Sequence, residues 1–188
     1  MTPLGQAAQA LTRALIDDPF YLAISGQAEP PQRYFAYALE EAQRTGRCVL
    51  AADPADGAAA WLLPRSGEVE AAESWAKAVT LNEILGARGH AAYNQIVASM
   101  SALAARHVSA DTWYLSIVGI DPRAQGRGLG TQLVAPTLAE ASAAGVPCYV
   151  ETFSRRSARF YELLGFVALA SERAPIIGEE YVLLRRDP

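Results

Sequence analysis

The chain has 188 residues, enough for one domain with a sizeable core, and 51% hydrophobic with 19% charged residues is an ordinary globular balance. The net charge of −4 argues against a general nucleic-acid binder, which presents a basic face, but leaves room for a local basic pocket. The N-terminus lacks a basic region followed by an apolar block, and no apolar run could span a membrane, so we expect a cytoplasmic protein.

In the first third of the chain, segments with helical periodicity alternate with short apolar runs that begin and end at turn residues. Apolar residues three to four apart predict helices, and apolar runs closed by turn clusters predict strands. Phe20, Tyr21, Leu22 and Ile24 form a further short apolar patch before Gly26. The predicted elements are a helix over 3–16, a helix over 30–45, and a hairpin of strands 47–52 and 58–63.

The middle segment, residues 67–111, carries two helical patterns. They extend over 69–85 and 90–106, and Gly86 and Gly89 separate them. Both glycines interrupt an otherwise continuous pattern, because glycine is a poor helix former. We therefore predict two helices here.

The last third follows an alternating pattern of strands and helices. Cys48 and Cys148 lie in apolar strand-like runs, and two cysteines in a chain of this length make no disulfide scaffold, so we expect both to be reduced and buried. Pro136 falls inside a predicted helix and should kink or loosen it. The predicted elements are a strand over 114–120, a helix from 129 to a cap at 145, a strand over 146–152, a helix over 155–164, and strands over 166–170 and 181–185.

A glycine-rich turn follows the strand over 114–120, which ends at Asp121-Pro122. A helix start that follows such a turn offers unpaired N–H groups and partial positive charge, which suits a phosphate. The P-loop pattern is absent, and the dinucleotide fingerprint fits poorly because Thr131 stands where it needs glycine or alanine. The turn consists of Gln125, Gly126, Arg127, Gly128, Leu129 and Gly130.

Two motifs together resemble the GNAT superfamily of N-acetyltransferases. The first is Q-x-x-G-x-G, from Gln125 to Gly130, after a strand that ends V-x-I. The second is Y-x-x-x-G-F, from Tyr161 to Phe166, and it follows an intervening strand. Their order is far more specific than either motif alone. Most of the chain is also similar to the puromycin N-acetyltransferase branch, including the stretches around Cys48 and Pro136.

This resemblance implies the fold and the co-substrate. It implies one α/β domain over 1–188, with a mixed, twisted, mainly antiparallel sheet of six or seven strands and helices on both faces. Residues 67–111 would be a helical insertion that covers the acceptor side. Acetyl-CoA would be the co-substrate, its pyrophosphate held by the turn amides and its pantetheine arm by a strand edge that bulges between Val118 and Ile120. The implied coenzyme-binding residues are Val118, Gly119, Ile120, Gln125, Gly126, Arg127, Gly128, Leu129, Gly130, Thr131 and Ser157.

The chemistry of acetyl transfer to an amine can be assigned to particular residues. An alkyl ammonium, with a pKa of about 10, must lose a proton before it can attack, and the leaving thiolate must gain one. Tyr161 fits the proton donor, because a phenol is neutral at pH 7. Glu151 is the carboxylate of the strand over 146–152 and fits the base, although strand-end acids are often merely solvated.

Several other residues remain alternatives. His90, His107 and Asp111 could serve as bases, although an ordinary surface or structural role is the commoner one for each. Cys148 suggests a covalent acyl-enzyme, but a strand cysteine is more often inert packing. No metal-binding motif is present, so we expect no metal. The arginines that could add local positive charge for the coenzyme phosphates are Arg127, Arg155, Arg156 and Arg159.

The first functional interpretation is therefore an N-acetyltransferase acting on a primary amine of a small molecule by direct attack. The alternatives are acetylation of a protein N-terminus or lysine, and a non-catalytic acyl-CoA-binding sensor. Aromatic rings in segments near the expected site favour an aromatic amine such as an aminoacyl nucleoside like puromycin. Those rings belong to Phe20, Tyr21, Tyr34, Trp75, Tyr93 and Trp113.

Overall fold

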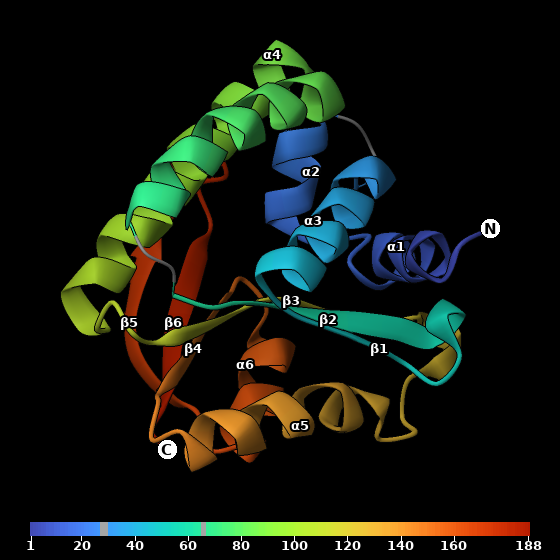
Figure 1. Ribbon diagram of the computed structural model, residues 1–188, viewed down its shortest axis with the longest axis vertical. Coiled ribbons are helices and arrows are strands. Elements are labelled where there is room, and N and C mark those ends of the chain that lie inside the picture. The colour runs from blue at the N-terminus through green and yellow to red at the C-terminus, as the bar shows by residue number, and fades with distance from the viewer. Residues whose placement is uncertain (27–29, 65–66) are drawn as a thin grey trace.

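A strongly bent sheet forms the centre of the protein, as the computed structural model in Figure 1 shows for residues 1–26, 30–64 and 67–188. Within these residues the sheet has six strands in the order β1-β2-β3-β4-β6-β5. Every neighbouring pair is antiparallel except β3 and β4, which are parallel. The strands are β1 (Gly46–Leu50), β2 (Gly57–Leu62), β3 (Trp113–Ile120), β4 (Cys148–Thr152), β5 (Val167–Arg173) and β6 (Glu180–Arg186). The predicted mixed, mainly antiparallel sheet is confirmed.

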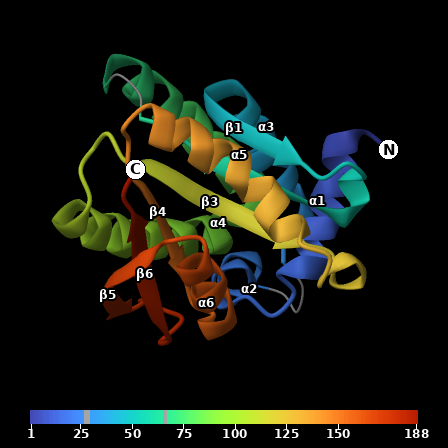
Figure 2. The same ribbon diagram turned by 90° about the horizontal axis from the view of Figure 1, so that it is seen from below.

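Helices cover both faces of this sheet. The first four lie on one face, and α5 and α6 lie on the other (Figures 1 and 2). Short 3-10 turns, η1 (Pro54–Asp56) and η2 (Pro122–Ala124), follow β1 and β3. The helices are α1 (Pro3–Ala14), α2 (Pro19–Ser25), α3 (Gln32–Thr45), α4 (Gly67–His107), α5 (Leu129–Ala143) and α6 (Arg155–Leu163).

The short apolar patch after Asp18 is a helix, α2, which the sequence pattern did not assign. Asp18 caps its start by accepting the Phe20 N–H at 3.0 Å, and Pro19 occupies the first helical position. Both are favourable at a helix N-terminus, since the cap satisfies a free donor and proline has none to satisfy. Gly26 ends the helix in the left-handed conformation. Seven residues are too few to show a helical period in the sequence.

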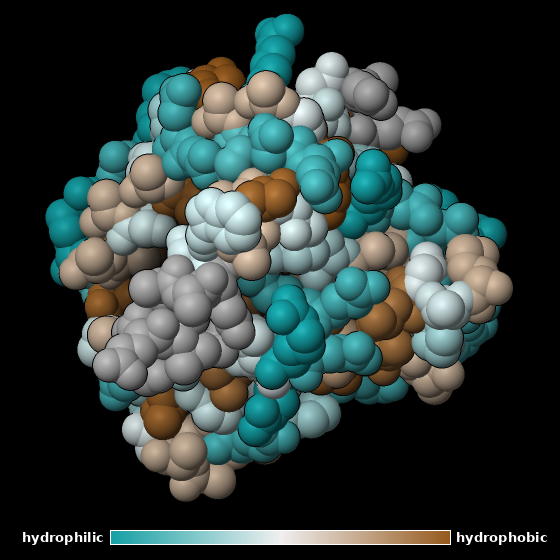
Figure 3. Space-filling view, turned by 45° about the horizontal axis from the view of Figure 1, so that its top comes forward, coloured by the Kyte–Doolittle hydropathy of each residue, from teal (hydrophilic) through white to brown (hydrophobic). Residues whose placement is uncertain are grey.

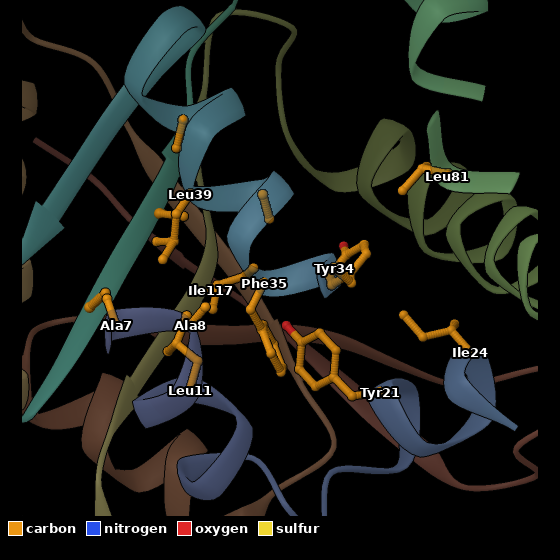
Figure 4. Packing of buried hydrophobic residues seen from close by; sticks show 14 of the residues in the cluster. Ala7, Ala8, Leu11, Tyr21, Ile24, Tyr34, Phe35, Leu39, Leu81 and Ile117 are labelled. Atoms are coloured by element: carbon orange, nitrogen blue, oxygen red, sulfur yellow. The ribbon is translucent and has the colours of Figure 1, made fainter. Parts of the chain in front are cut away.

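Two main hydrophobic clusters hold the helices to the sheet. In the first, Leu11 of α1 and Phe35 of α3 pack against Ile117 of β3, while Tyr21 and Ile24 of α2 extend the cluster toward α4 (Figure 4). The second lies on the other face, where α5 and α6 pack on β2, β3, β4 and β6. Burial of apolar surface, which contributes about 25 cal/mol per Å², holds these helices against the sheet.

The predicted helical segment 67–111 forms α4 with a sharp kink at Gly86, whose φ of 68° and ψ of 170° are not helical. The prediction of two helices is thus confirmed, but Gly89 lies within the second helix. A Cβ at Gly89 would stand 2.2 Å from the Ile24 carbonyl oxygen. Gly89 therefore lets α4 approach α2 closely.

Substituting Gly89 by Ala should destabilise the protein by roughly 1–3 kcal/mol, because the methyl overlaps the α2 backbone. Urea unfolding gives this free energy. Gly5→Ala is the matched control, since Gly5 is also helical and a methyl there meets only the flexible side chains of Met1 and Thr2. A loss at Gly5 equal to that at Gly89 would contradict the close packing of α2 against α4.

The sheet opens between β3 and β4. They pair only at Trp113 with Cys148 and at Tyr114 with Tyr149, after which β3 continues beside β2 and β4 beside β6. An extra β3 residue, Ser116, interrupts the pairing with β2, because Ala60 faces Ile117 whereas Trp61 faces Leu115. The bulge expected between Val118 and Ile120 therefore lies earlier in the strand.

The N–H groups of β3 alternate between its two sides. The Asp121 N–H donates to the Asp56 carbonyl oxygen, on the β2 side. By strand alternation the N–H groups of Ile120 and Val118 point the other way, into the opening that β4 has left. This edge therefore offers free backbone donors to an extended ligand.

None of the helices in the described part of the chain is long and apolar enough to cross a bilayer. On the face seen in Figure 3, hydrophilic and hydrophobic residues are interspersed. Cys148 is buried as predicted, whereas Cys48 is only half-buried, and both are free thiols.

Candidate active site

A groove of about 670 Å³ runs along the open edge of β3 and over the glycine-rich turn. Its walls come from the segment between α1 and α2, the end of β3, the start of α5 and one side of α6. We call it the glycine-turn groove. Ten of the eleven residues predicted from the family resemblance to bind the coenzyme line it: Val118, Gly119, Ile120, Gln125, Gly126, Gly128, Leu129, Gly130, Thr131 and Ser157.

The turn itself is shaped to receive an anion. Gly126 and Gly128 have φ of 78° and 75°, a region that favours glycine, and a Cβ at either would stand in open space. Gly128 is the N-cap of α5 and brings no side chain to cap the first N–H groups of that helix. These donors and the helix dipole therefore face the groove.

Side chains fix the turn against its neighbours. The Gln125 amide donates from Nε2 to the Ile120 carbonyl oxygen at 3.1 Å, and Arg156 donates to Gln125 Oε1 at 3.1 Å. The buried Asp121 carboxylate accepts from Arg123 at 3.0 Å and from Arg13 of α1 at 2.5 Å. These arginines hold the pKa of Asp121 well below its usual range. The end of β3 is thereby tied to α1, η2 and α6.

A second cavity, of about 480 Å³, lies between the open part of the sheet and helices α2, α3 and α4. We call it the tyrosine cavity, because five tyrosines line it. Burial raises the pKa of all five, so their hydroxyls stay neutral hydrogen-bonding groups. They are Tyr21, Tyr34, Tyr93, Tyr114 and Tyr149.

Charged groups occupy two places in this cavity. Lys77 of α4 donates to Glu41 of α3 at 3.0 Å, so these two charges offset each other. Glu151 of β4 lies on the same wall as Tyr149, two residues before it, and Tyr149 stacks on Tyr114 with ring centroids 4.4 Å apart. The uncompensated charge of the lining thus comes from carboxylates.

Glu151 is held in an environment that favours its protonated form. Its Oε1 is buried without a hydrogen-bond partner, while the Tyr114 hydroxyl hydrogen-bonds to the carboxylate. Burial raises the pKa of Glu151 to about 7, against the opposing effect of Tyr114. A carboxylate with such a pKa can accept a proton near neutral pH.

The two cavities are adjacent. Asp18 and Phe153 line both of them. Tyr161 lines the glycine-turn groove, with its side chain only 6% exposed and its ring packed against Phe160 and Phe166. Burial, and then the charge of Asp18, raise the pKa of the Tyr161 hydroxyl, so it remains protonated at neutral pH.

Comparison with known proteins decides the family. The model of the acetyltransferase (GNAT) family matches residues 62–166, more than half of the chain. The chain belongs to the GNAT family. Members of this family use acetyl-CoA as co-substrate, so the protein is an acetyltransferase.

Solved structures share this GNAT fold. A Corynebacterium glutamicum protein described as histone acetyltransferase HPA2 and related acetyltransferase has a TM-score of 0.69 at 23% identity, and the match covers 98% of this chain and 91% of that protein. The polyamine N-acetyltransferase of Drosophila melanogaster has a TM-score of 0.66 at 17% identity, with coverages of 98% and 96%. A mosquito arylalkylamine N-acetyltransferase-like protein has 0.65 at 13%, with coverages of 98% and 95%.

Some residues named from the sequence lie away from both cavities of this GNAT domain. Arg127 is exposed, and its side chain reaches Asp56 at 3.6 Å. His90, His107 and Asp111 line neither cavity. Of the four arginines considered for the coenzyme phosphates, Arg156 alone lines the groove.

The expected aromatic rings are divided in the same way. Phe20, Tyr21, Tyr34 and Tyr93 line the tyrosine cavity. Trp75 is 75% exposed, and the Trp113 ring faces Arg47 instead. The two groups differ in the face of the helix or strand on which the ring lies. The sequence shows that a residue is aromatic but does not show which face it occupies.

Burial also argues against the covalent alternative. It raises the pKa of the Cys148 thiol to about 11, so the thiol stays protonated and weakly nucleophilic. Cys148 lines neither cavity. Among the described residues, no cluster of His, Cys, Asp and Glu is arranged to hold a metal ion.

The site contains residues that sequence reasoning missed, above all Asp18 and Phe153. Asp18-Pro19 does carry a signal, because an Asp before a Pro is a helix-start pattern. That signal predicts a cap, and only the fold brings the capping carboxylate to the wall that the two cavities share.

Proposed function

We propose that this protein transfers the acetyl group of acetyl-CoA to a primary amine of a small molecule by direct attack. One observation carries the proposal: the glycine-turn groove and the tyrosine cavity share the wall formed by Asp18 and Phe153. Two substrates bound in these cavities would meet there without a covalent enzyme intermediate. We further propose one domain over 1–188, in which the inserted segment 67–111 supplies the α4 wall of the acceptor cavity.

The glycine-turn groove fits the coenzyme. Its uncapped helix start and two open glycine positions suit a pyrophosphate, and Arg156 lies beside them. The free N–H groups of Val118 and Ile120 suit an arm that binds strand-like along β3. The bound thioester supplies the activated acetyl group.

Gly128→Val should weaken coenzyme binding by more than about tenfold, roughly 1.4 kcal/mol, because the branched side chain occupies the open space over the turn. Calorimetric titration with coenzyme A measures this. Gly145→Val is the matched control: Gly145 follows α5 with φ of 68° and open surroundings, so its backbone strain is similar, at about 1–2 kcal/mol. Equal coenzyme affinity in the two variants would contradict the assignment.

Glu151 and Tyr161 take the roles of base and acid in this proposal. Glu151 accepts a proton from the acceptor ammonium, and its raised pKa lets it do so near neutral pH. Tyr161 protonates the departing sulfur. A backbone N–H at the open edge of β3 polarises the thioester carbonyl as charge builds on its oxygen.

The tyrosine cavity, which we propose to hold the acceptor, favours a compact amine that is planar or can form hydrogen bonds. Its volume of about 480 Å³ suits a small molecule, its tyrosine faces can stack on a ring or a cation, and its uncompensated carboxylates attract a positive charge. Structurally similar proteins are named for polyamine, agmatine and arylalkylamine acetylation, which supports an amine acceptor. Among small primary amines, we propose an aromatic one such as puromycin as the acceptor.

A panel assay tests the proposal by release of free coenzyme thiol. Puromycin, arylalkylamines, polyamines, aminoglycosides, amino acids and short peptides are compared at equal concentration. We expect kcat/KM for at least one small amine to exceed that for every peptide. Turnover restricted to peptides would contradict the small-molecule acceptor, and no turnover with any amine would favour a coenzyme-binding sensor.

A further inference from the structure

Asp18 has a position that neither Glu151 nor Tyr161 shares. It is the ionisable residue common to the described linings of both cavities, whereas Glu151 lines the tyrosine cavity and Tyr161 lines the glycine-turn groove. On the function proposed above, the two substrates react across the boundary that the cavities share, and Asp18 is the carboxylate that lines both sides of it.

The local structure holds this carboxylate in place. Asp18 caps α2, with Oδ1 accepting the Phe20 N–H at 3.0 Å, and Pro19 fixes the backbone that follows. Asp18 also interacts electrostatically with Tyr161, whose hydroxyl pKa its charge raises. A fixed carboxylate near the proposed acid is well placed to exchange a proton with it.

The reaction needs a second proton acceptor. A primary ammonium carries three protons on nitrogen, and the amide product carries one, so nitrogen loses two protons while sulfur gains one. Glu151 accounts for the loss that precedes attack, and Tyr161 accounts for the gain on sulfur. The second loss, from the nitrogen that has bonded to the acetyl carbon, has no acceptor in this scheme.

We propose that Asp18 is a second catalytic carboxylate, which accepts the second proton of the attacking nitrogen and returns it to Tyr161. This inference rests on the function proposed above. As the N–C bond forms and the C–S bond breaks, the sulfur takes its electron pair and the proton of the Tyr161 hydroxyl. Asp18 takes the nitrogen proton and passes it to the Tyr161 oxygen. Both groups are then restored, and one proton, from Glu151, leaves to solvent.

The surroundings of Asp18 suit a group that takes and then releases a proton. Burial raises its pKa to about 6, the Phe20 and Tyr21 N–H groups oppose this, and the charge of Glu179 adds to it. A carboxylate with a pKa nearer to neutrality is a better base than an ordinary one.

Asp18→Asn tests the proposal, because asparagine caps a helix as well as aspartate does but cannot take a proton. We expect kcat to fall by about 10²-fold, with the dissociation constants of coenzyme A and of the acceptor changed by less than about threefold. Asp53→Asn is the matched control: Asp53 also precedes a proline and caps a helical turn, with Oδ1 accepting the Ala55 N–H at 3.0 Å, but it lies outside both cavities. Its kcat should stay at the wild-type value.

A second variant separates catalysis from structure. Asp18→Ser keeps a capping hydroxyl and removes the carboxylate, so added formate should restore part of its kcat but none of that of Glu151→Gln. A kcat of Asp18→Asn within twofold of wild type, or losses in kcat and binding of equal size without formate rescue, would overturn the proposal. Wild-type turnover with a small amine, measured first, tests the proposed function separately.

Discussion

Replacing Tyr161 by Phe should lower kcat by roughly 10²–10⁴, the usual contribution of a positioned general acid. The ring and its packing against Phe160 and Phe166 remain, and only the proton is lost. The buried hydroxyl has a raised pKa, so it is protonated throughout the neutral range and available to the sulfur. Thiol release with saturating substrates measures kcat, and titration calorimetry should show coenzyme affinity nearly unchanged.

Tyr181→Phe is the control for this experiment. Tyr181 is fully buried and lines neither cavity, and the substitution keeps the ring that packs against Phe153, so only a buried hydroxyl is lost. We expect its kcat to equal that of the wild type. If Tyr161→Phe retained a kcat within threefold of wild type, the phenol would be a packing group and water would protonate the sulfur.

Glu151→Gln should lower kcat/KM by roughly 10²–10⁴ at pH 8, because the amide cannot accept the ammonium proton. In the wild type, kcat/KM should fall as the pH drops below about 7, since protonation of Glu151 removes the base. The variant should lack the fall near pH 7 and keep only a fall below about pH 6, where Asp18 becomes protonated. A pH profile of kcat/KM for both proteins tests this, and an unchanged acid limb in the variant would show that another group is the base.

Glu151→Gln should raise the free energy of unfolding at neutral and higher pH, although it lowers activity. The folded-state pKa of Glu151, about 7, lies above its ordinary value of 4.5, so the folded protein binds the proton more tightly than the unfolded chain does. That stabilisation is complete below pH 4.5 and is lost as the pH rises through 7. Glu151→Gln should therefore gain up to about 3 kcal/mol relative to wild type between pH 4.5 and pH 8.

Urea unfolding at these two pH values gives the free energies needed. The comparison across pH cancels any packing difference between the amide and the carboxyl group. A higher free energy of unfolding for the variant at pH 8 would mean that the fold keeps Glu151 at some cost in stability, as is common for functional groups. An equal difference at both pH values would show that Glu151 is not held in a desolvated environment.

The sequence predicts the sheet, the long helices and the glycine turn well, because each depends on local patterns. The strand over 114–120 is mainly apolar, carries no acid or base, and stops at Asp121-Pro122, and β3 ends at Ile120. Gly86 breaks the helical pattern of the inserted segment, and α4 kinks there. A local rule suffices at a proline that ends a strand, but not at every glycine, since Gly89 remains within the helix.

The parts that the sequence does not predict depend on distant contacts. Asp18 and Phe153 are 135 positions apart, and no local pattern says that they share a wall between two cavities. The bulge at Ser116 depends on the register of β3 against β2, which side-chain pattern alone leaves open by one residue. The positions of the Trp75 and Trp113 rings away from the cavities are likewise not predicted, since composition does not show which face of a helix or strand a ring occupies.

A crystal structure with coenzyme A and a turned-over amine tests the central claim most directly. We expect the pyrophosphate on the N–H groups of the turn from Gln125 to Gly130, the thiol near Tyr161, and the amine in the tyrosine cavity. The amine nitrogen should lie toward Asp18 and Phe153, where the cavities join. Density for the amine outside the tyrosine cavity, or for the coenzyme away from the glycine-turn groove, would contradict the account.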